Sequence, residues 1–259
     1  MKIDENSHVP LYFQLRENIR EKIISGEWKY ADEIPSETTL CRDLNLSRTT
    51  VKQAFDGLVA EGLIIRKRGR GSYVNYKKLS YRMMEQPNFY QQMDDEGADQ
   101  KSLVVDKQYI SLNKSIADKL DVPTGEKVAY FKRIRNIDNV PMIIQDVYIL
   151  PEYEKGLMEK DLTDISFHRY IEEKNNFILD CFDIDISAII LNQEDQHYFN
   201  VEGYVSGFHF DTIYQSKGKK IIYNERVFRG DMVNLSLNFD YRKGMNKKEF
   251  KVISEQDKF

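Results

Sequence analysis

A helical pattern directly after a tight turn constrains the fold of this chain more than any other feature. Between residues 51 and 59 the apolar side chains recur at i, i+3, i+4, i+7 and i+8, which predicts an amphipathic helix that ends at Gly62. Ser47 provides an N-cap for this helix, and only the turn 45–47 separates it from a shorter helix capped by Ser36. Two short helices joined so tightly predict a helix-turn-helix motif.

The segments on either side complete this motif. An earlier helix begins at Pro10, repeats an apolar residue at every fourth position and ends at Gly26. After Gly62, two short strands, 63–66 and 72–75, flank a basic glycine turn, which predicts a β-hairpin. Three helices followed by a hairpin describe a winged helix-turn-helix, whose third helix enters the major groove of DNA.

The basic residues are placed unevenly in a chain whose formal net charge is -4. Residues 1–76 hold 12 Lys and Arg against 11 Asp and Glu, and seven of those basic residues gather between positions 42 and 74. A local basic patch on an acidic protein is the electrostatic footprint of a DNA-binding module.

Contacts to double-stranded DNA are expected from the two helix caps, the start of the third helix and the wing. Any one of these residues could equally solvate an exposed face, and it is the order of the whole set that favours DNA. The candidates are Ser36, Arg42, Ser47, Arg48, Thr49, Thr50, Lys52, Lys67, Arg68, Gly69 and Arg70.

Residues 9–75 resemble the N-terminal domain of the GntR family of bacterial transcription regulators. Three stretches carry the resemblance: VPLYFQLRENIREKIISGEW, IPSETTLCRDLNLSRTTVKQAFDGLVAEGLI and RGRGSYV. It implies that Arg48, Lys52 and Gly69 contact operator DNA. A basic residue usually follows the PSE segment in that family, and Thr38 stands there in this chain, so one DNA contact is expected to differ.

The remainder of the chain follows a different pattern. The polar, basic segment 77–87 predicts a linker. Beyond it, alternating apolar residues predict strands at 102–110, 127–135, 142–150, 177–191, 206–214 and 220–228, with helices near 115–120, 152–158, 166–174 and 194–199. Short turns between neighbouring strands favour an antiparallel sheet with helices packed on it, so the whole chain is expected to be α+β.

Four landmarks in this region resemble the UTRA effector-binding domain, the partner of this winged helix in the HutC-type branch of the GntR family. They are FYQQMDDEG, KRIRNIDNVPM, SFHRYIEEKNNF and FRGDMVNLSLNF, and the resemblance covers residues 88–240. It implies a chorismate-lyase-like fold. The expected organisation is a DNA-binding domain over 1–76, a linker over 77–87, an effector-binding and dimerisation domain over 88–245 and a polar tail over 246–259.

In many UTRA domains the effector is a phosphorylated sugar, and the resemblance implies that Arg133 and Arg135 hold its anionic group. Residues two apart on a strand share a face, so both guanidinium groups can converge on one anion. The alternative is that both arginines pair with acids on neighbouring strands, such as Asp146 or Glu225. The expected effector-binding residues are Asn88, Phe89, Tyr90, Arg133, Arg135, Gln145, Ser166, His168, Glu225 and Phe228, with Ser166 also capping a helix.

Several positions depart from the sugar-phosphate pattern. Asn88 and Tyr90 replace a serine and a threonine, and Gln145 and Ile222 replace acids. The pocket is therefore expected to be less suited to a polyol and more aromatic, with rings at His168, Tyr148, Tyr223 and Phe228. Because the arginine pair is retained, we expect an anionic effector, which need not be a sugar phosphate.

Motifs for catalysis are absent from the sequence: there is no phosphate-binding glycine loop, no His-Glu-x-x-His, no Cys-x-x-Cys and no nucleophile elbow. We therefore expect no enzyme, no cofactor and no metal site. A metal interpretation of Asp183, Asp185, His197 and His209 is weaker than the interpretation that they solvate a strand edge and a loop. Cys41 and Cys181 are too few for a disulfide framework, and no apolar run is long enough to span a membrane.

The expected function is therefore that of a cytoplasmic transcription regulator. It binds a near-palindromic operator as a homodimer and acts as a repressor that a small anionic effector releases. A transcriptional activator of the same family is the main alternative, and an enzyme on the C-terminal domain is a weaker one.

Overall fold

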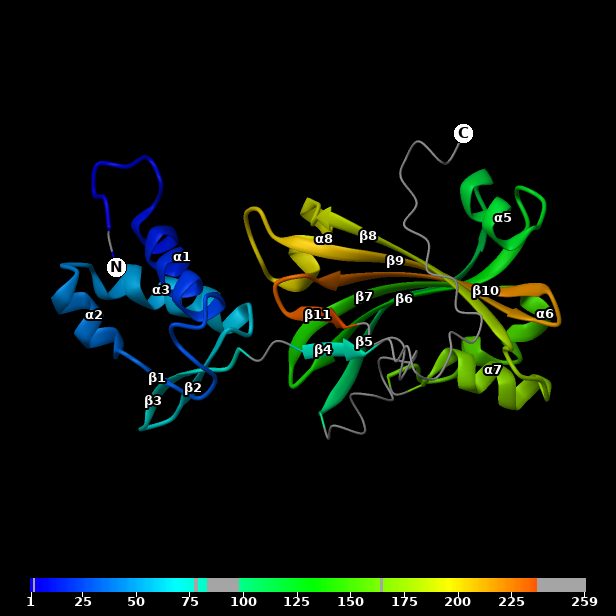
Figure 1. Ribbon diagram of the computed structural model, residues 1–259, viewed down its shortest axis with the longest axis horizontal. Helices are drawn as coiled ribbons and strands as arrows, with labels where there is room; N and C mark the ends of the chain where they lie inside the picture. The colour runs from blue at the N-terminus through cyan, green and yellow to red at the C-terminus, as the bar shows by residue number, and fades with distance from the viewer. Residues whose placement is uncertain (2, 77–78, 83–97, 164, 237–259) are drawn as a thin grey trace, which may run out of the picture.

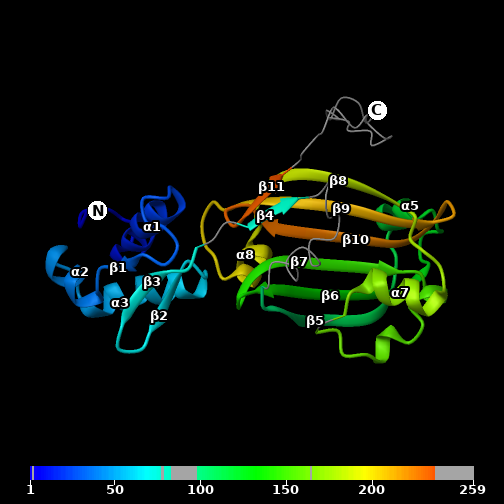
Figure 2. The ribbon, with the colours of Figure 1, turned by 60° about the horizontal axis from the view of Figure 1, so that its bottom comes forward.

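Figure 1 shows the computed structural model of the chain, which describes residues 1, 3–76, 79–82, 98–163 and 165–236. A small helical unit at the N-terminal end lies against one end of a larger, elongated sheet (Figures 1 and 2). Within the described ranges, no helix has both the length and the apolar character that crossing a membrane requires.

The small unit contains three helices, α1 (Leu11–Ile24), α2 (Glu37–Asp43) and α3 (Arg48–Ala60). The Ser36 and Ser47 hydroxyls cap α2 and α3, because each accepts a hydrogen bond at 3.1 Å from the amide three residues later. Gly62 follows α3 with a φ of 79°, a conformation that ends a helix and favours glycine. The apolar faces of these helices meet in one core that includes Leu15, Ile19, Val51, Phe55 and Leu58.

The wing is a hairpin of β2 (Ile64–Lys67) and β3 (Gly71–Val74), as the sequence predicts. A third strand, β1 (Glu33–Ile34), pairs with the other side of β3. Strand β1 has two residues, which is too short for an alternating pattern, so the sequence gives no sign of it.

The larger unit is a six-stranded sheet in which every neighbouring pair is antiparallel. Its strands in spatial order are β5 (Gln100–Ser111), β6 (Lys127–Ile137), β7 (Val140–Ile149), β10 (Lys219–Arg229), β9 (Ser206–Ser216) and β8 (Cys181–Ile190). All six strands predicted from alternation are present. The main difference in bounds is β8, which begins at Cys181 rather than at residue 177.

Helices cover both faces of this sheet (Figure 1). On one face α5 (Lys114–Leu120) and α8 (Gln193–Phe199) pack on apolar residues that include Val128 and Ile134. On the other face lie α6 (Pro151–Glu154), a 3-10 turn η1 (Leu157–Glu159) and α7 (Phe167–Asn175), which pack on Phe131 and Val147. The α+β fold class, with a winged helix followed by an antiparallel sheet and packed helices, is confirmed.

A short strand lies within the segment predicted to be a linker. Strand β4 (Leu79–Arg82) pairs in parallel with β11 (Val233–Ser236). Four residues are too short for a convincing alternation, so the strand follows from its pairing with β11 and not from its own sequence. The remaining residues of the predicted linker, 77–78 and 83–87, and the predicted tail, 246–259, lie outside the described residues.

One apolar core runs across the contact between the two units. It joins α1, α3 and the wing with residues from β6, β7, β10 and the end of the sheet, including Ile137, Val140, Met142, Phe228 and Met232. The central strands of the sheet therefore extend from the middle of the larger unit to the winged helix (Figure 2).

Candidate functional site

The first half of α3 presents polar residues to solvent. Arg48, Thr49 and Lys52 are exposed, while Val51 and Phe55 are fully buried on the opposite side of the helix. Neither Arg48 nor Lys52 forms an ion pair with any residue that the structure describes, so both charges can reach a phosphate or a base edge.

Arg66 is basic but does not belong to this surface. Its guanidinium donates to Glu37 at 2.9 Å and also to Asp56 on α3. These contacts neutralise Arg66 inside the winged helix and tie β2 to α2 and α3. The charge that the wing offers to DNA therefore comes from its tip.

The wing tip is shaped by Tyr73. The Lys67 ammonium lies 4.7 Å from the centroid of the Tyr73 ring, and the Tyr73 hydroxyl donates to the Arg70 carbonyl at 2.8 Å. Arg68, Gly69 and Arg70 are exposed at the turn. A Cβ on Gly69 would meet no atom within 4 Å, so there is space for a larger residue at this position. The positive φ of 71° is what favours glycine here in the protein without DNA.

The other DNA-contact candidates take part in local hydrogen bonds. The hydroxyls of Ser36 and Thr39, and those of Ser47 and Thr50, lie 2.8 Å apart. The Arg42 Nε donates to Asp43 at 2.8 Å, although the Arg42 side chain is 77% exposed. Contacts from Ser36, Arg42, Ser47 and Thr50 to DNA stay predictions.

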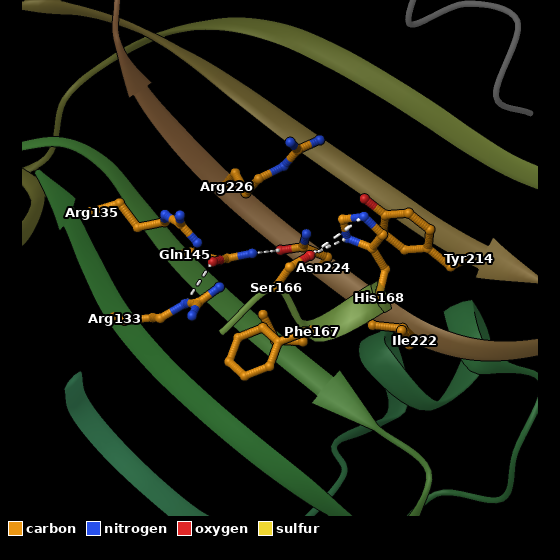
Figure 3. A pocket seen from close by; sticks show the side chains of 11 residues that line it. Arg133, Arg135, Gln145, Ser166, Phe167, His168, Tyr214, Ile222, Asn224 and Arg226 are labelled. Atoms are coloured by element: carbon orange, nitrogen blue, oxygen red, sulfur yellow. Dashed lines mark hydrogen bonds between the residues drawn. The ribbon is translucent and has the colours of Figure 1, made fainter. Parts of the chain in front are cut away.

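The larger unit contains a pocket on the face of the sheet that α7 covers (Figure 3). Side chains from β6, β7, β9, β10 and the start of α7 line it: Arg133, Arg135, Gln145, Val147, Ser166, Phe167, His168, Tyr214, Ile222, Asn224 and Arg226. The structure thus brings together five of the expected effector-binding residues, Arg133, Arg135, Gln145, Ser166 and His168.

Arg133 is 1% exposed and is held on several sides. Its Nε donates to Gln145 Oε1 at 2.9 Å, and its Nη1 donates to the carbonyls of Leu162 and Ile165 at 3.0 and 2.7 Å. Its guanidinium carbon lies 3.9 Å from the centroid of the Phe167 ring. Arg133 therefore ties β6 to the segment before α7 and lines the pocket as well.

Two polar residues of β10 complete the lining, and the sequence analysis missed both. Arg226 is 3% exposed and its Nη2 donates to Thr212 Oγ1 at 2.9 Å. Asn224 accepts a hydrogen bond from Gln145 Nε2 at 3.1 Å. Positions 222, 224 and 226 share one face by strand alternation, but only the pairing of β10 with β7 brings that face to Arg133.

Ser166 precedes α7 but does not cap it. Its hydroxyl lies 3.2 Å from His168 Nδ1 instead of accepting a bond from a helix amide. The His168 and Tyr214 rings are parallel, with centroids 6.1 Å apart. Burial and, after it, the nearby guanidinium charges, of which Arg226 contributes most, together lower the pKa of His168 to about 4. The imidazole is therefore neutral at pH 7.

Glu225 and Phe228 were expected in the site, and the structure places them elsewhere. Glu225 lies on the opposite face of the sheet, because its neighbours 224 and 226 face the pocket. Phe228 is fully buried in the core between the two units, with its ring centroid 4.7 Å from that of Phe210. Tyr148 and Tyr223 also face away from the pocket and stack on each other. Asn88, Phe89 and Tyr90 lie outside the described residues.

The acids considered as partners for the arginines also lie on that opposite face. Asp146 accepts a hydrogen bond from Tyr130 and lies 3.9 Å from the Lys132 ammonium. Glu225 contacts His209 Nε2 at 2.8 Å. Arg133 donates instead to the Gln145 side-chain oxygen and to two main-chain carbonyls.

A cluster on the opposite face resembles a cation site in composition. One ligand atom from each of His209, Asp211 and Glu225 lies within 4.8 Å of the others. Asp211 is already 2.7 Å from the Lys119 ammonium and accepts a hydrogen bond from Tyr223. The hydrogen bond to Glu225 raises the pKa of His209. Side chains of the protein thus already bind the members of this cluster. Of the four residues that the sequence offers for metal binding, this cluster contains His209.

Known proteins with similar sequences and folds cover nearly the whole chain. Residues 95–234 match the UTRA domain family, and residues 11–74 match the gntR family of bacterial regulatory proteins. The mannosyl-D-glycerate transport/metabolism system repressor MngR of Escherichia coli K12 is 26% identical over 249 residues, which cover 94% of this chain and 95% of that protein. The transcriptional repressor NagR of Bacillus subtilis is 26% identical over 232 residues, which cover 89% and 95%.

The fold has counterparts among solved structures. PhnF from Mycobacterium smegmatis superposes with a TM-score of 0.60 at 17% identity, over 87% of this chain and 99% of that one. YydK from Bacillus subtilis superposes with a TM-score of 0.52 at 19% identity, over 88% and 99%. At these identities the likeness concerns the fold alone.

Proposed function

This chain belongs to the GntR family of bacterial transcription regulators and carries a UTRA domain, and from that premise we propose that it is a repressor released from its operator by a small anionic effector. Family and relatives are transcription regulators, not enzymes. Two relatives that align over most of their length, MngR and NagR, are named repressors, which supports the same sign of regulation here.

The observation that carries the anionic effector is the convergence of three arginines on one pocket. Arg133 and Arg135 on β6 and Arg226 on β10 line it together, and no carboxylate is among the described lining residues. Guanidinium groups form strong, charge-assisted hydrogen bonds with phosphate and carboxylate oxygens. Ser166 and Asn224 add neutral polar groups at the same site.

The opposite wall of the pocket favours an effector with an apolar or planar part. Ile222, Tyr214 and the neutral ring of His168 line it, and Gln145 bridges Arg133 and Asn224 where an acid would bind sugar hydroxyls. A phosphorylated sugar remains one member of this class. The name of MngR links it to mannosyl-D-glycerate, which is an anionic sugar derivative.

Operator binding is assigned to the exposed residues of α3 and the wing tip, acting in a homodimer. One winged helix reads few base pairs, so two copies related by a two-fold axis suit a near-palindromic operator. Arg48 and Lys52 read the major groove in this proposal, while Lys67, Arg68 and Arg70 contact phosphates.

Two groups of measurements test the proposed function, one for DNA binding by a dimer and one for the effector. Footprinting and gel shift test whether the protein binds DNA upstream of its own gene. Sedimentation gives the oligomeric state of the protein. Sugar phosphates, phosphate and small carboxylates are then screened by thermal shift, and hits are titrated into the complex with DNA. An anion that stabilises the protein and releases DNA is the expected result, and Arg135→Ala should weaken both effects about tenfold or more. A monomer that binds the operator one-to-one, or release by neutral ligands alone, contradicts the proposal.

A further inference from the structure

The contact between the two units contains a cluster of buried charged groups. Arg16 and Arg20 come from α1, Glu61 follows α3, and Arg229 and Asp231 stand at the end of β10 and just beyond it. Glu61 and Arg229 are 0% exposed, and the side chains of the other three are at most 9% exposed. We call these five residues the interdomain cluster.

Several bonds of the interdomain cluster cross from one unit to the other. Arg229 Nη1 donates to the Glu61 carbonyl at 2.7 Å, and Arg20 Nη2 donates to Asp231 at 3.2 Å. Arg16 Nη2 donates to Glu202 at 3.0 Å at the rim of the contact. Within the larger unit, Arg229 also binds Asp231 at 2.8 Å. The end of β10 is thus bonded to both α1 and the C-terminal end of α3.

The Glu61 carboxylate is the weakly bonded member of the cluster. It lies 3.5 Å from Arg16 and 3.6 Å from Arg20, and neither of its oxygens accepts a hydrogen bond within the described part of the chain. A buried charge is stabilised only when good geometry and hydrogen bonds offset the loss of water. A small displacement of either unit therefore changes the energy of this contact.

The effector pocket and the interdomain cluster share the same strands. On β10, Asn224 and Arg226 line the pocket, and Arg229 follows three residues later at the cluster. The β6–β7 hairpin carries Arg133 and Gln145 in the pocket, and its far end packs Val140 against Gly62. A Cβ on Gly62 would lie 2.4 Å from Val140 Cγ2, so the two units meet there without free space.

The contact lies away from the DNA-reading end of α3. Arg48 and Lys52 belong to the first half of the helix, whereas Glu61 and Gly62 come after its last residue, Ala60. Docking therefore leaves the DNA-contact residues exposed. What the cluster can control is the position of α3 relative to the sheet, and hence the spacing of two recognition helices in a dimer.

We propose that the interdomain cluster is the coupling element of this regulator, in which Arg229 and Asp231 transmit the occupancy of the pocket along β10 to α1 and the end of α3. This inference rests on the proposed function. By linkage, a pocket that changes operator affinity must itself change when the operator binds. Operator DNA can therefore serve as the probe before any effector is known.

The test is hydrogen–deuterium exchange of the full chain with and without the DNA fragment that it protects upstream of its own gene. The variants are Asp231→Asn and Arg20→Gln, which act from opposite sides of the contact, so that one can replace the other if a variant fails to fold. The control is Glu27→Gln, which removes a surface ion pair with Lys22 near the end of the same helix, α1. Circular dichroism verifies the fold, and gel shift verifies DNA binding.

In wild type, DNA binding should change the hydrogen-exchange rates of α7 and of residues 222–226 by about fivefold or more. Fivefold is roughly the lower end of the usual allosteric coupling factors. The Glu27→Gln control should retain that change. In Asp231→Asn and Arg20→Gln the change should fall below about twofold while DNA still binds. No change at the pocket of DNA-bound wild type, or an undiminished change in the folded variants, overturns the coupling role and leaves the proposed function standing. Absence of any shifted DNA band overturns the proposed function, and the coupling role with it.

Discussion

Arg133 and Gln145 face each other across β6 and β7, and the Arg133 Nε donates to the Gln145 side-chain oxygen at 2.9 Å. Arg133 also donates to two main-chain carbonyls before α7. The neighbouring pocket arginine, Arg135, is 8% exposed, compared with 1% for Arg133. Both arginines of the pair are thus buried, and Arg133 supports the fold as well as lining the pocket.

Arg133→Met should destabilise the protein, because it leaves the carbonyls of Leu162 and Ile165 and the Gln145 amide oxygen without their donor. Each buried acceptor left unsatisfied costs about 1–3 kcal/mol, so with three of them we expect the free energy of unfolding to fall by about 3 kcal/mol or more. Urea unfolding measures it. Arg169→Gln is the control, since its exposed pair with Glu173 on α7 contributes less than about 1 kcal/mol. Equal effects of the two substitutions contradict a structural role for Arg133.

Arg48→Ala should lower operator affinity and relax base preference, because Arg48 stands at the exposed start of α3. Arg70→Ala at the wing tip should weaken operator and random DNA about equally and lower the slope of affinity against salt by about one. Fluorescence anisotropy with both DNAs at several salt concentrations distinguishes the two results. Arg169→Ala, on the far unit, should change neither. Unchanged binding in Arg48→Ala means that α3 does not read the operator.

The protein should lose stability as pH falls from 6.5 towards 4, in part because of His168. The pKa of His168 in the folded chain is about 4, below the ordinary 6.5, so over this range the unfolded chain takes up a proton and the native chain does not. The contribution is at most about 3 kcal/mol. His168→Asn should reduce the pH dependence of urea unfolding between pH 6.5 and 4, whereas His8→Asn, at an exposed position, should not. The same pH dependence in His168→Asn and wild type counts against this assignment.

Gly62→Ala should destabilise more than Gly26→Ala, although both glycines have nearly the same positive φ, 79° and 81°. A Cβ on Gly26 meets no atom within 4 Å, so only backbone strain of about 1–2 kcal/mol applies there. A Cβ on Gly62 meets Val140 of the other unit, which should add about 1–3 kcal/mol. Thermal or urea unfolding gives the difference, and Val140→Ala should recover part of it. Equal losses for the two glycine variants would show that the units do not dock closely at Gly62.

Local sequence signals determined the elements of this protein and the residues that share a face within one element. The caps at Ser36 and Ser47 and the end of α3 at Gly62 depend on groups only a few positions apart. The six strands are predicted from their alternating or continuous apolar residues, which are local features of the sequence. Arg133 and Arg135 lie on one face for the same reason, since side chains two apart on a strand point the same way.

Tertiary structure decided which faces meet and which charges become buried. Glu225 and Arg226 are neighbours in sequence, yet only the packing of α7 on one side of β10 makes Arg226 a pocket residue and Glu225 a partner of His209. Arg20 reads as part of the polar face of α1, but it is buried against Asp231, which lies 211 positions away. No local pattern reports such a contact, because the carboxylate that offsets the lost hydration of Arg20 comes from a distant part of the sequence.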